Sequence, residues 1–388
     1  MLPPRAVRKG SIRNEHVGGG VAGQEVVRIH VFLVAPVNPM GLSVGGTRTY
    51  VFGLGRSLTK MGFTVTIVGI GPPVNDGDIA FVAVSKKSLH SNLQYHRFLS
   101  RWAKRTRFAD GDVIDVQRPD FLCSFIGGSA RLGLVSTLHG DPLFAIRQRH
   151  SLGALVYGSA EYAGLTASHK VISVSESALP EYIRRYPFLA GKMTHVPNGV
   201  DLHTFGPRDR QRERDRLGIR DRPTILYAGR LEPEKRVSVL FDAVSLMPDP
   251  PTILIAGSGH DEAAIKARAR GTKVAMLGPI NHGEMPHVIA AADLVVLPSA
   301  FEGMPTIALE ALACGVPVAA TPVGDLPRLI VPGQTGYFFD GSPKSLRSVL
   351  QAHLEDAGKL RDYCVRAAQP YGWDAVGQRM SEVLRAAS

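Results

Sequence analysis

Short runs of apolar residues recur along the chain and alternate with longer stretches in which apolar and polar residues are mixed. A short apolar run between turn residues is typical of a buried strand, and the mixed stretches are long enough to form helices. Strands that alternate with helices predict a parallel sheet covered on both faces. The runs that predict strands are residues 26–35, 65–70, 113–115, 133–137 and 171–174, followed by 224–227, 252–256, 273–277, 294–297 and 316–320.

The alternation is interrupted once, near the middle of the chain. Turn residues are frequent over 196–207, and a charged stretch over 208–222 follows before the next apolar run begins. We therefore predict an α/β protein with two doubly wound, Rossmann-like domains that face each other across a central cleft. The predicted segments are a flexible, basic and glycine-rich tail over 1–24, a first domain over 25–204, a second domain over 205–370 and a final helix over 371–388.

The composition fits a globular protein with no membrane-spanning segment. The chain has 388 residues, enough for two domains, and 44% of its residues are hydrophobic. No apolar run approaches the roughly 20 residues that span a bilayer, and the N-terminal tail lacks the apolar core of a signal peptide. The three cysteines, Cys123, Cys314 and Cys364, are widely spaced and indicate neither a metal cluster nor a disulfide framework. We therefore expect a cytoplasmic protein.

An excess of positive charge predicts an anionic partner. The formal net charge is +11, because 45 Lys and Arg residues outnumber 34 Asp and Glu residues. The densest basic stretch, residues 95–108, interleaves cations with Phe98, Leu99 and Trp102 at helical spacing. Such a helix could lie on a membrane surface or could pack these side chains into its own domain, and the pattern fits both interpretations. No nucleic-acid-binding motif accompanies the charge, so we expect no nucleic-acid partner.

Residues 301–315 combine a loop, a helix and two carboxylates directly after a predicted strand. Pro305 stands where the first residue of a helix is expected, and Gly315 stands where that helix would end. A helix N-terminus offers unpaired backbone N–H groups and the positive end of the helix dipole, which together favour phosphate. Glu302 and Glu310 are eight residues apart and would therefore reach different parts of one ligand. The stretch predicts a ligand that carries phosphate and hydroxyl groups.

Two more candidate groups follow predicted strands, where ligands bind in sheets of this class. A glycine loop that ends at Gly45 and Gly46 follows the first strand and offers a second phosphate-facing arrangement. Arg230 and Lys235 follow the strand over 224–227. They could hold a diphosphate together, although either one alone would suit a surface salt bridge.

The ends of two other strands carry weaker signals. His139 follows the strand over 133–137, where it could transfer a proton, make a polar contact to a ligand or serve the structure alone. Gly257-Ser-Gly259 follows the strand over 252–256 but lacks the third glycine and the downstream acid of a dinucleotide fingerprint. It is therefore poor support for NAD binding.

Taken together, these segments resemble the GT-B glycosyltransferases of family 4, the glycosyl transferases group 1. Each motif is short and common by itself, but their order and spacing are specific, and the resemblance runs from about residue 26 to residue 384. The motifs that carry it are Gly45-Gly46, His139-Gly140, Ser173-Val-Ser175-Glu-Ser177, Asn198-Gly199-Val-Asp201, Gly229-Arg230 with Lys235, Gly257-Ser-Gly259, Glu302-Gly-Met-Pro with Glu310, and Tyr371-Gly-Trp373 before a final helix.

The resemblance implies a retaining transferase that moves a sugar from a UDP- or GDP-sugar to an acceptor hydroxyl, without a metal or another cofactor. It implies that Glu302 contacts the donor sugar, that Glu310 holds the ribose hydroxyls and that His139 lies beside the transferred sugar. It also implies that the final helix crosses back to the first domain. The other donor-site residues that it implies are Arg230 and Lys235, which bind and stabilise the leaving diphosphate, the loop of Gly45 and Gly46, the backbone of Gly303, Met304, Pro305 and Thr306, and the region of Leu277 near the base.

Two other functions stay open alongside a transferase. A nucleotide-sugar-binding protein without transferase activity would carry the same donor residues. A serine hydrolase is suggested by Gly41-Leu-Ser43-Val-Gly45, but residues 36–40 separate Ser43 from the strand end that a nucleophile elbow requires. The acceptor has no motif of its own. The basic stretch over 95–108 favours a lipid-linked or anionic acceptor, such as a cell-envelope glycan, at the inner face of the membrane.

Overall fold

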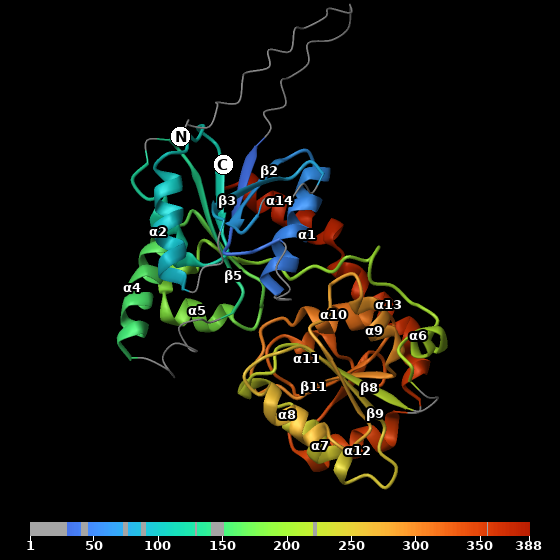
Figure 1. Ribbon diagram of the computed structural model, residues 1–388. Coiled ribbons are helices and arrows are strands. Elements are labelled where there is room, and N and C mark those ends of the chain that lie inside the picture. Colours follow the sequence, from blue (N-terminus) through green and yellow to red (C-terminus); the bar gives the residue numbers. More distant parts are fainter. Residues whose placement is uncertain are drawn as a thin grey trace, which may run out of the picture.

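The computed structural model describes residues 29–39, 46–72, 77–86, 91–128, 130–140, 151–219, 223–354 and 356–388. Within these ranges the chain forms two α/β domains, and each has one parallel sheet between layers of helices (Figure 1). The predicted class, α/β with two doubly wound domains, is confirmed. The predicted tail over 1–24, Ser43 and Gly45 lie outside the described residues.

The first domain is built on a seven-stranded sheet with the order β3-β2-β1-β4-β5-β6-β7. Val31 of β1 pairs with Val65 and Val113 of its two parallel neighbours. Because side chains alternate along a strand, Val31 and Leu33 face one apolar core and Phe32 faces the other. The elements are β1 (His30–Val34), α1 (Gly46–Lys60), β2 (Thr64–Ile70), β3 (Ala80–Ser85), α2 (Asn92–Ala103), β4 (Val113–Val116), η1 (Pro119–Ser124), β5 (Gly133–Leu138), α4 (Ser151–Ala167), β6 (Lys170–Ser173), α5 (Leu179–Arg185), η2 (Pro187–Leu189) and β7 (Met193–His195).

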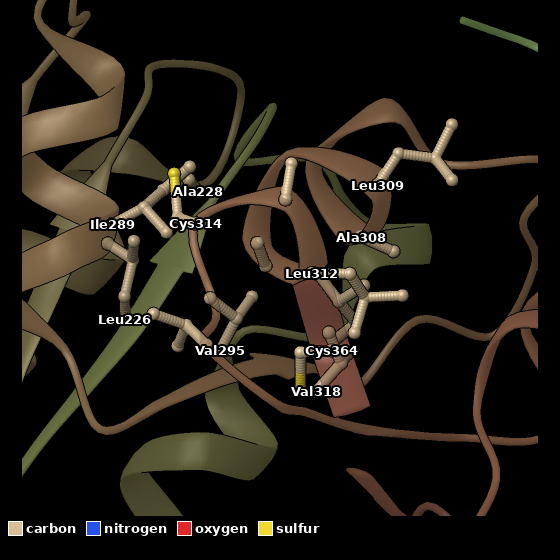
Figure 2. Close-up of a cluster of buried hydrophobic side chains, with 14 of the residues drawn as sticks. Leu226, Ala228, Ile289, Val295, Ala308, Leu309, Leu312, Cys314, Val318 and Cys364 are labelled. Carbon is tan, nitrogen blue, oxygen red and sulfur yellow. The ribbon is translucent and has the colours of Figure 1, made fainter. Parts of the chain in front are cut away.

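The second domain is built on a six-stranded sheet with the order β10-β9-β8-β11-β12-β13. Leu226 and Val295 belong to the core shown in Figure 2, while Ile225 and Val296 face the core on the other side of the sheet. The elements are α6 (Arg210–Arg216), β8 (Thr224–Ala228), η3 (Pro233–Lys235), α7 (Ser238–Ser245), β9 (Thr252–Ala256), α8 (Glu262–Ala269), β10 (Val274–Gly278), α9 (Met285–Ala291), β11 (Leu294–Leu297), α10 (Thr306–Ala313), β12 (Val318–Ala320), α11 (Leu326–Leu329), β13 (Gly336–Phe338), α12 (Pro343–His353), η4 (Ala357–Leu360), α13 (Arg361–Ala368) and η5 (Gln369–Tyr371).

The last helix, α14 (Trp373–Arg385), packs on the first domain against α1. Trp373 joins the core that β1 and α1 share, and Ser57 Oγ donates a hydrogen bond to the Trp373 carbonyl at 2.8 Å. A Cβ atom at Gly53 would lie 2.2 Å from the Trp373 ring, so only glycine permits this close approach. A β-bridge between Val200 and Gly372 places the two interdomain linkers side by side.

Three strands and one helix boundary differ from the sequence prediction. The strands that the apolar pattern did not reveal are β3, β7 and β13, and all three lie at sheet edges. β3 is only partly buried, while β7 and β13 have three residues each, so none produces a distinct apolar run. Pro305 is extended, with φ −71° and ψ 120°, and caps α10, which begins at Thr306. The predicted helix start was therefore one residue too early.

The basic stretch over 95–108 falls largely on α2 and has one packed face and one exposed face. Leu99 is fully buried, and the Trp102 ring contacts the rings of Phe32 and Phe108, as the packing interpretation predicts. Phe98, by contrast, is 36% exposed and does not join the core. In the described part of the chain, no helix combines the length and the apolar character needed to cross a membrane.

Candidate active site

A cleft of about 560 Å³ lies between the two domains, at the carboxyl ends of their strands. Parallel sheets bring strand ends to one edge, and the loops that follow carry the chemistry. The residues that line it are Gly46, Thr47, Thr49, His139, Gly140 and Asn198 from the first domain, and from the second Tyr227–Arg230, Glu234, Lys235, Ala256–Ser258, Pro279, Ile280, Met285, Leu297, Ser299, Phe301–Ile307 and Glu310. The structure thus brings most of the predicted site residues together.

Glu302 and Lys235 form an ion pair inside this cleft. The Lys235 ammonium donates to Glu302 Oε1 at 2.8 Å, and the Ser299 hydroxyl donates to the same oxygen at 2.6 Å. The side chains of Lys235 and Glu302 are only 16% and 10% exposed. Charge-assisted hydrogen bonds of this kind fix the carboxylate in position. The Glu302 carboxylate is therefore fixed in place and can accept hydrogen bonds from a ligand. The Lys235 ammonium group has further N–H donors that can bind the same ligand.

Arg230 lies at the rim of the cleft. Its side chain is 63% exposed and pairs with Glu234 at 3.3 Å.

Gly229 and Gly257, which follow neighbouring strands, bring the backbone close together, because a Cβ atom at Gly257 would lie 1.9 Å from the Gly229 carbonyl oxygen. The glycines of the Gly257-Ser-Gly259 segment thus serve close backbone packing.

The backbone between the two predicted carboxylates faces the N-terminus of α1. A Cβ atom at Gly46 would lie 3.8 Å from the side chain of Thr306, so the starts of α1 and α10 face each other across the cleft. Asn198 of the first domain donates from Nδ2 to the Met304 carbonyl at 2.7 Å and holds this loop. First-turn N–H groups have no acceptor within their own helix. The two converging helix starts therefore favour an anion here.

Glu310 lies deeper in the cleft and is only 8% exposed. Burial raises the pKa of its carboxyl group from the usual 4.5 to about 7. His282 Nδ1 lies 4.0 Å from Glu310 Oε1. Such a carboxyl group can exchange hydrogen bonds with ligand hydroxyls at neutral pH.

His139 is held by a chain of hydrogen bonds. Its Nε2 lies 2.7 Å from Gln117 Oε1, while Gln117 Nε2 donates to the buried carboxyl group of Asp115 at 2.9 Å. Because the Gln117 amide nitrogen faces Asp115, its oxygen accepts the proton of His139 Nε2. Burial lowers the pKa of His139 to about 4, so the ring is neutral at pH 7. His139 therefore offers a neutral polar contact at the cleft wall.

The pattern of the sequence did not single out Gln117, Ser299 or Asp325, although all three hold the site. The Asp325 carboxylate, from the loop after β12, accepts hydrogen bonds from the backbone N–H groups of Glu176 and Ser177 at 2.8 and 2.9 Å. These bonds connect the two domains. Each of the three residues follows a strand, as the other candidates do. A search of all residues that follow predicted strands would therefore have found them.

One predicted residue lies elsewhere. Leu277 is in β10 and packs against the core of its domain, so it does not line the cleft. The chain turns at Gly278, where φ is +68°, and it is the following residues, Pro279 and Ile280, that reach the cleft.

Comparison with known proteins gives the family of this chain. The model described as Glycosyltransferase Family 4 matches residues 44–204, and the model described as Glycosyl transferases group 1 matches residues 209–370. D-inositol 3-phosphate glycosyltransferase 1 from Catenulispora acidiphila is 26% identical, over 95% of this chain and 97% of that protein.

Solved structures share the fold over nearly the whole chain. Sucrose-phosphate synthase from Thermosynechococcus elongatus superimposes with a TM-score of 0.79 at 22% identity, over 92% of this chain and 98% of its own. The Anabaena protein HepE in complex with UDP and glucose gives a TM-score of 0.74 at 20% identity, over 92% of this chain and 99% of its own.

The two family models together span most of the chain, one over each domain. The chain therefore belongs to the GT-B glycosyltransferases of the family 4 type, as the order of its motifs predicted. It is a glycosyltransferase.

Proposed function

We propose that this glycosyltransferase takes a UDP- or GDP-sugar as donor and transfers the sugar, with retention and without a metal, to an acceptor hydroxyl. One observation carries the proposal: the starts of α1 and α10, Lys235 and the carboxyl groups of Glu302 and Glu310 line a single cleft. A nucleotide sugar has the matching sequence of groups, with hydroxyls on its ribose and its sugar and two phosphates between them.

The donor would lie along α10. Glu310 would hold the ribose hydroxyls, the backbone over 303–307 would bind the phosphates, and Glu302 would contact the sugar. Lys235 has three N–H donors and can bind a phosphate while it keeps its hydrogen bond to Glu302. Arg230 at the rim adds a second cation for the diphosphate.

In the proposed step the bond between the sugar carbon and the diphosphate oxygen breaks, and the acceptor oxygen bonds to the same carbon. The acceptor proton passes to the departing phosphate oxygen. Negative charge develops on the leaving group, so Lys235 and the two helix starts stabilise the transition state. These fixed charges do what a divalent cation would do, which supports transfer without a metal. Glu302 is held by Lys235 and Ser299, which favours positioning over proton transfer and is consistent with retention.

A panel of UDP-, GDP- and ADP-sugars in a thermal shift assay would identify the donor, because a ligand that binds the folded state raises the melting temperature. Product formation with the best donor is then followed in EDTA, and NMR gives the configuration of the new linkage. We expect turnover in EDTA and an anomeric configuration equal to that of the donor. Donor binding without a product for any acceptor or water would instead indicate a binding protein, and an inverted product would refute retention.

Substitution of Lys235 by Met tests the role of the cleft charge. Loss of one preorganised donor to developing negative charge typically lowers kcat by about 100- to 1000-fold. Lys273 is a matched control, because it forms an ion pair with Asp249 on the surface of the same domain. We expect Lys273→Met to stay within about twofold of the wild type, since surface pairs contribute little. Equal activity of both variants would contradict the proposed role.

We further propose that the exposed face of α2 contacts an anionic membrane that presents a lipid-linked acceptor. Leu93, at the start of α2, is 72% exposed, and Arg97 and Arg101 are exposed on the same helix. α4 packs beside α2 on η1 and exposes Leu155 and Val156 by 68% and 66%. Exposed apolar side chains next to cations suit the boundary of a lipid bilayer.

Flotation with vesicles of neutral lipid alone and with added anionic lipid tests this contact. We expect binding only to anionic vesicles, and we expect Arg97→Glu with Arg101→Glu to abolish it, because each basic residue near such a surface contributes about 1 kcal/mol. Arg379→Glu, on the exposed face of α14, serves as the control. Binding that depends on neither lipid charge nor salt would refute the membrane contact.

A further inference from the structure

A second cavity, of about 610 Å³, lies beside the active-site cleft, where α1 meets the two interdomain linkers. Its walls come from α1, from residues 200–203, 369 and 372 of the linkers, from the start of α14, and from His282 in the loop after β10. The cavity touches the cleft at two places, because Thr49 lines both and His282 lies 4.0 Å from Glu310. Its volume lies in the usual range for small-molecule sites.

One face of α1 supplies three cations to this cavity. Arg48, Arg56 and Lys60 line it together with Phe52, and the spacing of four residues places all of them on one side of the helix. Two histidines, His203 and His282, face the same space. Groups that can donate hydrogen bonds to an anion therefore come from both domains, because α1 belongs to the first domain and His282 to the second.

The charge of Arg48 is only partly compensated. Arg48 donates to the Pro39 carbonyl at 2.6 Å, but its Nε is buried and has no hydrogen-bond partner among the described residues. Burial, and then the like charge of Arg56, lower the pKa of Arg48. Burial is also the main cause of the lowered pKa of His282; the Asp201 carboxylate raises that pKa, while Arg48 and Arg56 lower it. An anion in the cavity would relieve this repulsion.

Two carboxylates, Asp201 and Asp374, also line the cavity and offset part of its positive charge. Asp201 accepts hydrogen bonds from the Thr204 hydroxyl at 2.7 Å and from the His203 backbone N–H at 3.0 Å, so its own turn holds it. Asp374 is exposed in the first turn of α14. In the described ranges of the chain, no carboxylate forms an ion pair with Arg48 or Lys60.

We propose that this cavity is a second anion-binding site, which takes a small phosphorylated molecule with its phosphate group on Arg48 and Arg56. Arginine suits this ligand because its planar N–H donors match phosphate oxygens. His282 and Lys60 lie around the same space for the remainder of the molecule. The ligand contacts both domains, so it stabilises their observed arrangement. The site is separate from the donor seat at 303–307 and goes beyond the transfer reaction.

Titration of the full-length protein with pyrophosphate and with inorganic phosphate, at constant ionic strength, tests the site by calorimetry. Variants distinguish phosphate binding in the second cavity from phosphate binding in the donor seat. We expect Arg56→Gln and Arg48→Gln to weaken binding in the cavity by about tenfold or more, since each removes charge-assisted hydrogen bonds. Lys235→Ala, which alters the donor seat, should keep this binding. Arg101→Gln on α2 removes an equal charge outside both sites and should resemble the wild type.

Arg56 is exposed, so Arg56→Gln leaves the core intact. Its anion binding therefore tests the proposed site even if Arg48→Gln does not fold. The proposal is overturned if the wild-type protein binds neither anion. It is also overturned if Lys235→Ala alone abolishes binding while both arginine variants bind normally, because the anion would then lie only in the donor seat. Circular dichroism of each variant confirms that the fold is retained.

Discussion

Substitution of Glu310 by Gln should stabilise the protein and weaken its nucleotide binding together. The pKa of Glu310 rises from 4.5 to about 7 on burial, so the ionised form is disfavoured in the folded state. The difference between the two values, at about 1.36 kcal/mol per pKa unit, corresponds to about 3 kcal/mol. Below the unfolded pKa the carboxyl group is protonated in both states and this cost is absent. It grows as pH rises and is complete above the folded pKa, where the carboxylate is charged in both states.

The stability effect is measured by chemical denaturation at pH 5 and at pH 8. Glutamine has nearly the same shape but no charge, so we expect a gain in unfolding free energy of about 1 kcal/mol at pH 5 and about 3 kcal/mol at pH 8. Glu382→Gln, on the exposed face of α14, is the matched control and should show no such gain. A gain that is equal at both pH values would refute burial as the origin of the effect.

Binding of the nucleotide should change in the opposite direction. An ionised carboxylate accepts hydrogen bonds from ribose hydroxyls, and a hydrogen bond to a charged group contributes about 1.5–3 kcal/mol. We therefore expect Glu310→Gln to raise the Kd of the nucleotide by about 10- to 100-fold at pH 8. At pH 5, where the folded carboxyl group is protonated, the two proteins should bind more alike. A variant that is more stable yet binds the nucleotide normally would remove Glu310 from the donor site.

Three further substitutions test the packing and the hydrogen bonds of the cleft. Gly257→Ala should lower the unfolding free energy by about 1–3 kcal/mol or more, because the new Cβ meets a backbone oxygen, whereas Gly283→Ala, with open space around it, should stay within about 0.5 kcal/mol of the wild type. Gln117→Glu should raise the pKa of His139 above about 4, because a carboxylate then faces its Nε2; an NMR titration of the ring that matches the wild type would contradict this hydrogen-bond chain. Asp325→Ala should speed hydrogen exchange at the backbone amides of residues 176 and 177, and unchanged exchange would show that the interdomain bonds do not form in solution.

The alternation of apolar runs was sufficient to predict both sheets, because fully buried parallel strands have apolar residues on both faces. Val31 to Val34 and Ile225 to Tyr227 are strands of this kind. The pattern failed at the edges, where β3 is partly exposed and β13 is only three residues long. The pattern also could not tell which apolar residues of α2 are buried. Leu99 is buried and Phe98 is exposed, although both belong to the same helical pattern.

The candidate site was predictable where chemistry and position coincide. Glu310 lies within α10, and Lys235 lies in η3 just after β8; both of these elements reach the cleft. Their partners were not predictable, because a hydrogen bond between Lys235 and Glu302 joins residues 67 positions apart. The same holds for Gln117, which is an ordinary polar residue in the sequence and becomes significant only through its contacts with Asp115 and His139.

The return of α14 to the first domain has a consequence for biosynthesis. Trp373, Met380 and Leu384 are part of the same core as Leu33 and Leu54, although more than 300 residues separate them in the sequence. A ribosome releases these last residues only after the entire second domain has been made. The first domain therefore cannot complete its core during synthesis, and the second domain can fold before it. A stop codon just before Trp373 would remove few residues, yet it would damage the half of the protein that is translated first.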